Sequence, residues 1–108
     1  AALNIVAGFS RPINLKAKAI IQHGCSRIPS ATKVEADYEN GMVNIKTYHC
    51  DGSVCVNIYD EAGNIIRTNV FKANESNNID ISNLPIGNYI LEIVTENQTY
   101  TGFFPVSY

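Results

Sequence analysis

The chain of 108 residues has little of the charge that binding to nucleic acid or to an anionic membrane surface requires. Charged residues make up 17% of it, the formal net charge is −2, and no run of basic residues is interleaved with aromatics. Proteins that bind nucleic acids carry clustered Lys and Arg, so we expect no nucleic-acid partner. No apolar stretch approaches the about 20 residues of a transmembrane helix, so we expect no membrane insertion.

The sequence also lacks the motifs that mark common catalytic sites. There is no G-x-S-x-G, and the nearest serine context, GFSR at residues 8–11, lacks the second glycine. A Gly-rich phosphate loop and a calcium loop of spaced Asp and Asn residues are absent as well. The carboxylate pair Asp60-Glu61 falls in a predicted turn, where solvation explains it. We therefore expect no enzyme, no catalytic residue and no cofactor.

The candidate metal ligands are the two histidines and three cysteines: His23, Cys25, His49, Cys50 and Cys55. Structural zinc sites use four such ligands, usually in pairs with the spacing C-x₂₋₄-C. The pairs HGC and HC are spaced more closely than this, and adjacent residues of a strand point to opposite faces. We therefore expect no metal site.

Cys50 and Cys55 flank Asp51-Gly52, which we interpret as a hairpin turn between strands at 42–49 and 54–59. On this interpretation the two cysteines share one face, either as free thiols or as a cross-hairpin disulfide. Because the loop is short, the disulfide would contribute only about 2 kcal/mol in the chain-entropy model. Redox chemistry of the thioredoxin type uses C-x-x-C at a helix start, and a β-turn does not provide that setting.

From residue 31 onward, alternating apolar and polar side chains predict antiparallel strands of about 5–8 residues. Asn40-Gly41 is a strong hairpin signal, because type I′ turns need positive φ at both central positions. Residues 60–63 and 96–98 predict two more hairpin turns, and residues 73–78 a polar loop. Residues 64–71 alternate only weakly, which indicates a strand that lies near a sheet edge or is partly covered on both faces.

These segments amount to about seven short strands at roughly 10-residue spacing, without a helical pattern. The count and spacing predict an all-β fold, either a β-sandwich of two antiparallel sheets or a small barrel. We expect the sandwich to span residues 31–108, with residues 1–30 as an extended N-terminal segment packed on it. Residues 15–23 are interpreted as an extra strand, with a short helix as the alternative. The predicted core is Val34, Val43, Ile45, Val56, Ile58, Ile79, Ile81, Leu91, Ile93 and Phe104.

The stretch LPIGNYILEI, residues 84–93, has the pattern of a tyrosine corner. In such a corner the ring of Tyr89 is buried and its hydroxyl bonds to backbone a few residues upstream. Leu84 would fill the same layer of the core, and Gly87 would permit a close approach. We expect these three residues to have a structural role.

A resemblance rests on VNIYDEAGNII (56–66), on NIDISNLPIGNYILEI (78–93) and on Tyr100, Gly102, Phe104 and Val106 at alternate positions. This string resembles a family of small exported proteins from gut-dwelling Gram-negative anaerobes, known as a domain of unknown function. More distantly, it is similar to fibronectin type III domains and to C-terminal sorting domains of a bacterial secretion system. The resemblance covers residues 31–106 and implies an immunoglobulin-like fold and an exported location. It implies no catalytic residues.

Two functions are expected from these observations. The first is a non-catalytic, exported binding or adhesion module with a protein or glycan partner, for which Tyr48 and Tyr59 are the candidate binding residues because both point outward from predicted neighbouring strands. The alternative is a structural or secretion-sorting sandwich within a larger assembly. The location would be periplasmic, cell-surface or secreted.

The apolar stretch at residues 1–12 adds an expectation about partners. It contains Leu3, Ile5 and Phe9, which are too apolar to remain in water, and open sheet edges accept an additional strand. We expect it to pair along a sheet edge, in its own chain or in a second copy that forms a homodimer. Pro12 would end this pairing.

Overall fold

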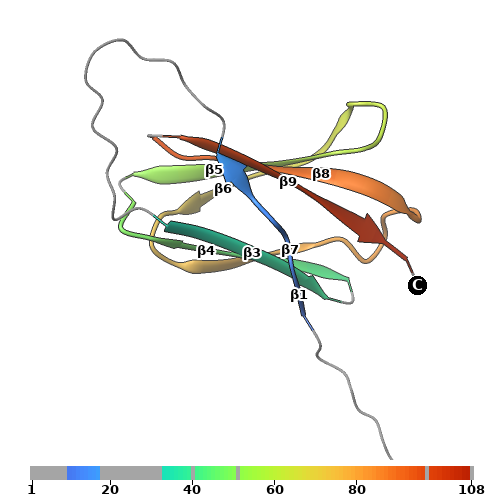
Figure 1. Cartoon of the computed structure of the whole chain (residues 1–108), viewed down its shortest axis with the longest axis horizontal. Coiled ribbons are helices and arrows are strands. Elements are labelled where there is room, and N and C mark those ends of the chain that lie inside the picture. The colour runs from blue at the N-terminus through green and yellow to red at the C-terminus, as the bar shows by residue number, and fades with distance from the viewer. Residues whose placement is uncertain (1–9, 18–32, 40, 51, 97, 108) are drawn as a thin grey trace, which may run out of the picture.

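The protein, described by a computed structural model, is a sandwich of two antiparallel sheets (Figure 1). The structure describes residues 10–17, 33–39, 41–50, 52–96 and 98–107. One sheet has the strand order β1-β3-β4-β7 and the other β2-β9-β8-β5-β6. The four-stranded sheet consists of β1 (Arg11–Pro12), β3 (Lys33–Glu39), β4 (Met42–Tyr48) and β7 (Ser76–Asp80). The five-stranded sheet consists of β2 (Lys16–Ala17), β5 (Ser53–Tyr59), β6 (Ile65–Lys72), β8 (Gly87–Val94) and β9 (Thr99–Val106). The predicted all-β sandwich is confirmed.

Inward-facing side chains of the two sheets form one core. Nine of the ten predicted core residues are buried, and the tenth, Val34, is half-buried against the same cluster. Phe104 on β9 holds the layers together, because an aromatic ring from each sheet packs on it. The ring centroid of Tyr38 on β3 lies 5.9 Å from that of Phe104, and the centroid of Tyr89 on β8 lies 5.8 Å away.

Three predicted hairpins are confirmed. Glu39 pairs with Met42 across a two-residue loop, and Gly41 in that loop has the positive φ, 76°, that the Asn-Gly signal predicts. The β5–β6 turn contains Gly63 with a φ of 91°, and β8 pairs with β9 as predicted. β6 is the outer strand of its sheet, in agreement with its weak alternation. Local turn chemistry therefore accounts for these connections.

The predicted hairpin at residues 51–52 is wrong, because the chain there crosses from one sheet to the other. β4 and β5 belong to different sheets. The Asn74 side chain holds the crossing: its Oδ1 accepts a hydrogen bond from Cys50 N and its Nδ2 donates one to Cys50 O, both at 2.8 Å. The Asn74 backbone N–H also donates to the buried Thr47 hydroxyl, at 2.7 Å. His49 and Asn74 both have positive φ, 55° and 66°, so the crossing depends on an unusual backbone that distant residues stabilise.

The polar loop predicted at residues 73–78 is shorter than expected. β7 begins at Ser76, because residues 76–78 already pair with β4. Residues 76–78 are all polar, and they belong to the outer strand of the four-stranded sheet. An outer strand does not require apolar side chains at every inward position. The two inward residues, Ile79 and Ile81, are buried as predicted.

Residues 10–17, which we call the strap, run from the edge of the four-stranded sheet to the edge of the five-stranded sheet on one side of the sandwich (Figure 1). Its first part, β1, pairs with β3, and its last part, β2, pairs with β9. Between them Ile13 is buried, and its N–H donates to the Ala36 carbonyl at 2.9 Å. A Cβ atom at Gly102 would lie 2.6 Å from the Asn14 carbonyl oxygen, so the strap sits directly on the β9 backbone.

The strap accounts for the part of the predicted N-terminal segment that the structure describes. Arg11 and Pro12 pair with β3 of the chain's own sheet, and the Ile13 N–H adds one more backbone hydrogen bond to that strand, so Pro12 does not end the pairing. Residues 1–9 and 18–32 lie outside the described part, and with them most of the strand predicted at 15–23. Exchange of this segment with a second copy stays a prediction.

Candidate functional site

The residues of the predicted tyrosine corner lie together where the chain crosses from β7 to β8. Tyr89 is buried, and its hydroxyl donates a hydrogen bond to the Pro85 carbonyl, 2.5 Å away. Leu84 is buried too, and its N–H donates to the Ile81 carbonyl at 3.1 Å. A Cβ atom at Gly87 would lie 3.8 Å from the Tyr89 ring, an ordinary contact, so space does not require glycine there. This cluster is part of the core architecture.

Cys50 and Cys55 are both described, and no disulfide joins them. Cys50 is buried at the crossing between the sheets, whereas Cys55 is half-buried on β5, opposite Val70 and Val94. The shared face predicted for the two cysteines depended on the hairpin that does not form. The two residues therefore lack the cross-hairpin geometry that the disulfide alternative required.

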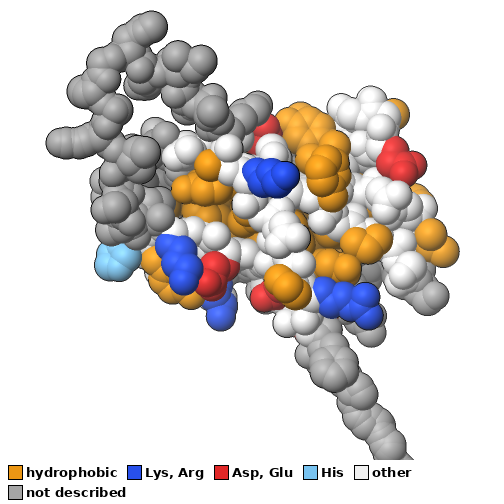
Figure 2. All heavy atoms as spheres, in the orientation of Figure 1, with side chains coloured by type: hydrophobic (Ala, Val, Ile, Leu, Met, Phe, Trp, Pro, Cys, Tyr) orange, Lys and Arg blue, Asp and Glu red, His pale blue; other side chains and the backbone are white. Residues whose placement is uncertain are grey.

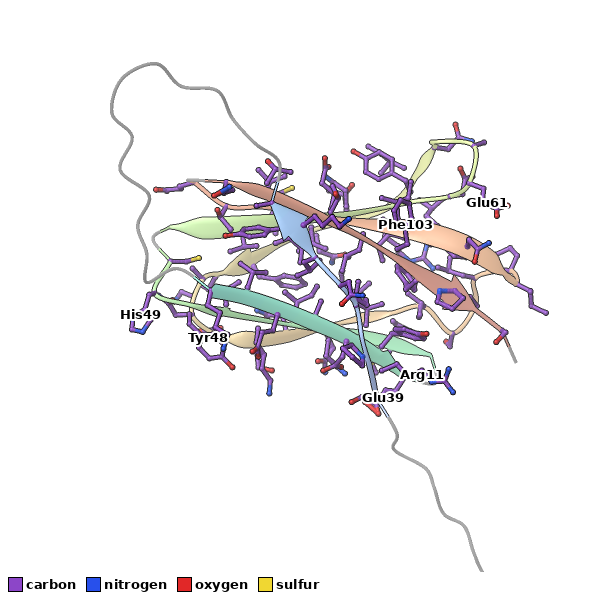
Figure 3. All side chains as sticks on the ribbon, viewed as in Figure 1. Arg11, Glu39, Tyr48, His49, Glu61 and Phe103 are labelled. Atoms are coloured by element: carbon purple, nitrogen blue, oxygen red, sulfur yellow. The ribbon has the colours of Figure 1, made fainter. Side chains whose placement is uncertain are left out.

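The candidate metal ligands are not gathered into a site within the described part of the chain. His23 and Cys25 lie outside it, and His49 is exposed at the end of β4 (Figure 3). No three His, Cys, Asp or Glu side chains among the described residues lie together as metal ligands would. The same part of the chain contains no helix with the length and apolar character to span a membrane.

Tyr48 and Tyr59 do not form one platform, because β4 and β5 belong to different sheets. Tyr48 lies on the four-stranded sheet (Figure 3) with its hydroxyl 3.5 Å from Glu35 Oε1 and its ring centroid 5.9 Å from Lys33 Nζ. Lys33 also forms an ion pair with Glu35, at 3.1 Å. Tyr59 lies on β5 of the five-stranded sheet, where its hydroxyl donates a hydrogen bond to Glu92.

The outward side of β9, β8, β5 and β6, which we call the outer face, carries three rows of side chains that cross the strands. The register of the strand pairs places the members of each row side by side. The first row is Phe103, Ile90, Tyr59 and Ile65; the second is Thr101, Glu92, Asn57 and Thr68; the third is Thr99, Val94, Cys55 and Val70. A polar row therefore lies between two largely apolar rows.

Hydrogen bonds organise the middle row. Glu92 Oε1 accepts from Asn57 Nδ2 at 2.9 Å and from the Tyr59 hydroxyl at 2.8 Å. The Thr68 hydroxyl donates to Asn57 Oδ1 at 3.0 Å, which fixes the orientation of that amide. The hydrogen bond to Glu92, and burial as a smaller effect, raise the pKa of Tyr59 above its ordinary value, because deprotonation would break the bond and place two negative charges together. The carboxylate is thus held in one position.

The two flanking rows expose apolar surface. Phe103 is 74% exposed, Val70 66% and Ile65 54%, which makes them three of the five large exposed hydrophobic residues in the described chain. Hydrophobic side chains reach the surface above the five-stranded sheet in Figure 2, and Phe103 lies on that sheet in Figure 3. Apolar side chains gathered in this way mark interaction surfaces more often than single ones do.

Sequence reasoning singled out Tyr59 but missed Glu92 and Phe103. The signal for both is the alternation of their strands. Glu92 stands between the inward residues Leu91 and Ile93, and Phe103 precedes the inward Phe104, so both must point outward. What the alternation could not show is that these two residues share one face with Tyr59, since that requires the strand order.

Comparison with protein families identifies a family model that matches more than half of the chain. The model described as the secretion system C-terminal sorting domain matches residues 39–106. These residues run from the end of β3 to the end of β9 and so include every strand from β4 onward. Comparison with curated proteins gives no match.

Among solved structures, the chain is similar to a DUF3244 family protein with an immunoglobulin-like β-sandwich fold from Bacteroides vulgatus. The TM-score is 0.72 and the sequence identity 20%, over 91% of this chain and 99% of that one. This likeness establishes the immunoglobulin-like fold. The expected resemblance to secretion-system sorting domains is confirmed by the family model, and the expected immunoglobulin-like fold is confirmed by the solved structure.

Proposed function

Because the chain belongs to the family of secretion system C-terminal sorting domains, we propose that it is an exported, non-catalytic sandwich that directs a larger protein or assembly through that secretion system. The match over residues 39–106 carries this proposal, since it spans β4 to β9, which are six of the nine described strands. Of the two functions expected from the sequence, the sorting role is therefore favoured. An exported or cell-surface location follows from the same role.

The absence of catalysis is part of the proposal. Neither the description of the matched family nor that of the similar solved structure names an enzyme activity. A fold alone does not determine function, so the argument rests on the outer face as well. On this face Asn57 and Tyr59 both donate hydrogen bonds to the Glu92 carboxylate. A carboxylate held in this way suits the binding of a partner rather than catalysis.

A fusion experiment tests the sorting role. The full chain is joined to the C-terminus of a stable reporter protein and expressed in a bacterium that has this secretion system. We expect the reporter outside the cell or on its surface, and inside the cell in an isogenic strain without the secretion machinery. Retention of the folded fusion in the competent strain would contradict the proposal.

A pair of variants separates recognition of the folded domain from recognition of a linear signal. Leu91→Asp places a charge at a fully buried position and unfolds the sandwich, whereas Ile86→Asp changes a residue that is 68% exposed. We expect export to fail for the first variant and to persist for the second. Circular dichroism of the purified fusions verifies the folding of each.

A further inference from the structure

Glu92 lies in the middle row of the outer face, and no described Lys, Arg or His forms an ion pair with it. Within the described part of the chain, the only ion pair joins Lys33 to Glu35, on the opposite sheet. Lys16 lies in the same row as Glu92 but beyond Thr101, so one strand separates them. Two outward Tyr–Glu pairs in the described part of the chain therefore differ: Glu35 forms an ion pair with Lys33, whereas Glu92 forms none with a described residue.

The two hydrogen bonds to Glu92 leave one side of the carboxylate available. Both Asn57 and Tyr59 donate to Oε1, and among the described residues no hydrogen bond to Oε2 occurs. Exposed apolar side chains flank the carboxylate, with Phe103 74% exposed, so a ligand that covers them would exclude water and strengthen the attraction between Glu92 and a cation. The face is thus complementary to a positive charge within an apolar ligand.

The spacing of the rows indicates the shape of that ligand. Ile90, Glu92 and Val94 stand at alternate positions of β8. Along this strand the polar row therefore lies about 6.7 Å from the apolar row on each side of it. An extended peptide places its own side chains at i, i+2 and i+4 with the same repeat. The repeat of the face therefore matches that of an extended peptide laid along β8.

We propose that the outer face binds an extended segment of a partner protein that places an arginine against Glu92, with apolar side chains two positions before and two positions after it. Arginine suits this position better than lysine. Its planar guanidinium donates to a carboxylate through two N–H groups and packs flat on aromatic rings such as Tyr59 and Phe103. This inference concerns the domain by itself and stands whether or not the chain directs sorting.

Titration of the full chain, labelled with ¹⁵N, with short synthetic peptides tests the proposal by NMR. The probe is the blocked pentapeptide Val-Thr-Arg-Thr-Val, and the control replaces its arginine with citrulline, which has the same shape without the charge. We expect the arginine peptide to shift the amide signals of Asn57, Glu92 and Phe103. The citrulline peptide should bind about tenfold more weakly or worse.

Substitutions on the outer face test whether the peptide binds there. Glu92→Gln keeps the shape and an acceptor oxygen but removes the charge, and should weaken the arginine peptide about tenfold. Glu35→Gln makes the same change on the opposite sheet and should leave the affinity unaltered. Phe103→Ser should weaken binding severalfold, whereas Ile86→Ser, at a position of similar exposure outside the strands, should not. Dispersed NMR spectra show that each variant is folded.

Several results would overturn the proposal. Equal binding of the arginine and citrulline peptides, or unchanged affinity in Glu92→Gln, would show that the carboxylate does not recognise the cation. Shifts confined to the four-stranded sheet would place the site elsewhere. No binding by the folded wild-type chain at millimolar peptide would rule out the interaction. Shifts of the outer face by cellohexaose but not by the arginine peptide would indicate a glycan ligand instead.

Discussion

The Tyr89 hydroxyl donates a hydrogen bond to the Pro85 carbonyl, four residues before it in the chain. The ring of Tyr89 packs in the core against Phe104, while its hydroxyl reaches the loop that leads from β7 to β8. One side chain thus joins the core of the five-stranded sheet to the crossing between the sheets.

We predict that Tyr89→Phe lowers the free energy of unfolding by about 1–3 kcal/mol, because the Pro85 carbonyl loses its donor. The measurement is urea denaturation at neutral pH. Tyr48→Phe is the matched control, since the Tyr48 hydroxyl lies 3.5 Å from Glu35 at an exposed position and its loss should cost less than about 0.5 kcal/mol. Equal stability of Tyr89→Phe and the wild type would show that the corner bond does not stabilise the fold.

The contact between strap and β9 gives a second prediction. A methyl group at Gly102 would meet Ile13 Cγ2 at 2.7 Å as well as the Asn14 carbonyl, so Gly102→Ala should displace the strap and cost about 1–3 kcal/mol. Hydrogen exchange of the Ile13 amide should accelerate, because this amide bonds to Ala36. Gly87→Ala, where the added methyl finds ordinary contact, should change neither quantity. Protection of Ile13 in both variants would contradict the prediction.

A third prediction concerns the crossing held by Asn74. Asn74→Ala removes both hydrogen bonds to Cys50. It also puts alanine at a φ of 66°, a backbone conformation that asparagine tolerates better than alanine does. We expect the free energy of unfolding to fall by about 2–4 kcal/mol. Asn74→Gly loses the same hydrogen bonds but tolerates the backbone, so it should be about 1 kcal/mol more stable than Asn74→Ala. The reverse order in thermal or urea unfolding would show that backbone strain is not involved.

Two aspartates predict how stability changes in acid. The backbone N–H of Asn64 donates to Asp60 and lowers its pKa, and the backbone N–H of Ser82 does the same for Asp80. Because the folded pKa of each lies below the unfolded value of about 3.9, their contributions are complete above that value and are lost as the pH falls through the folded pKa. Unfolding free energies measured from pH 5 down to pH 2 should therefore decrease. The double variant Asp60→Asn and Asp80→Asn should show a smaller decrease, and an unchanged slope would contradict the assignment.

Most of the strands and turns could be predicted from sequence, because each depends on local chemistry. The Asn40-Gly41 hairpin and the turn at Gly63 follow from residues that accept positive φ. The inward residues follow from alternation, which is why nine of the ten predicted core residues are buried. These features need no knowledge of the strand order.

The connection after β4 could not be predicted in this way. Asp51-Gly52 has the chemistry of a hairpin, yet the chain crosses to the other sheet, and the crossing is held by hydrogen bonds from Asn74, which lies 24 residues from Cys50. Because the chain crosses between the sheets here, Tyr48 and Tyr59 lie on different sheets and Cys50 and Cys55 do not share a face. The crossing also brings Glu92, Tyr59 and Phe103 together, so the candidate site depends on a connection that local patterns do not determine.

The position of the strap has a mechanical consequence. β1 and β2 are each held by a two-residue ladder, so a pull on residue 10 loads one short ladder after the other and peels the strap away in small steps. A pull on the end of β9 loads its eight-residue ladder with β8 all at once and along the strands, and the force is shared among those bonds. Force applied at residue 10 therefore meets two short ladders in succession, whereas force applied at Val106 meets an eight-residue ladder.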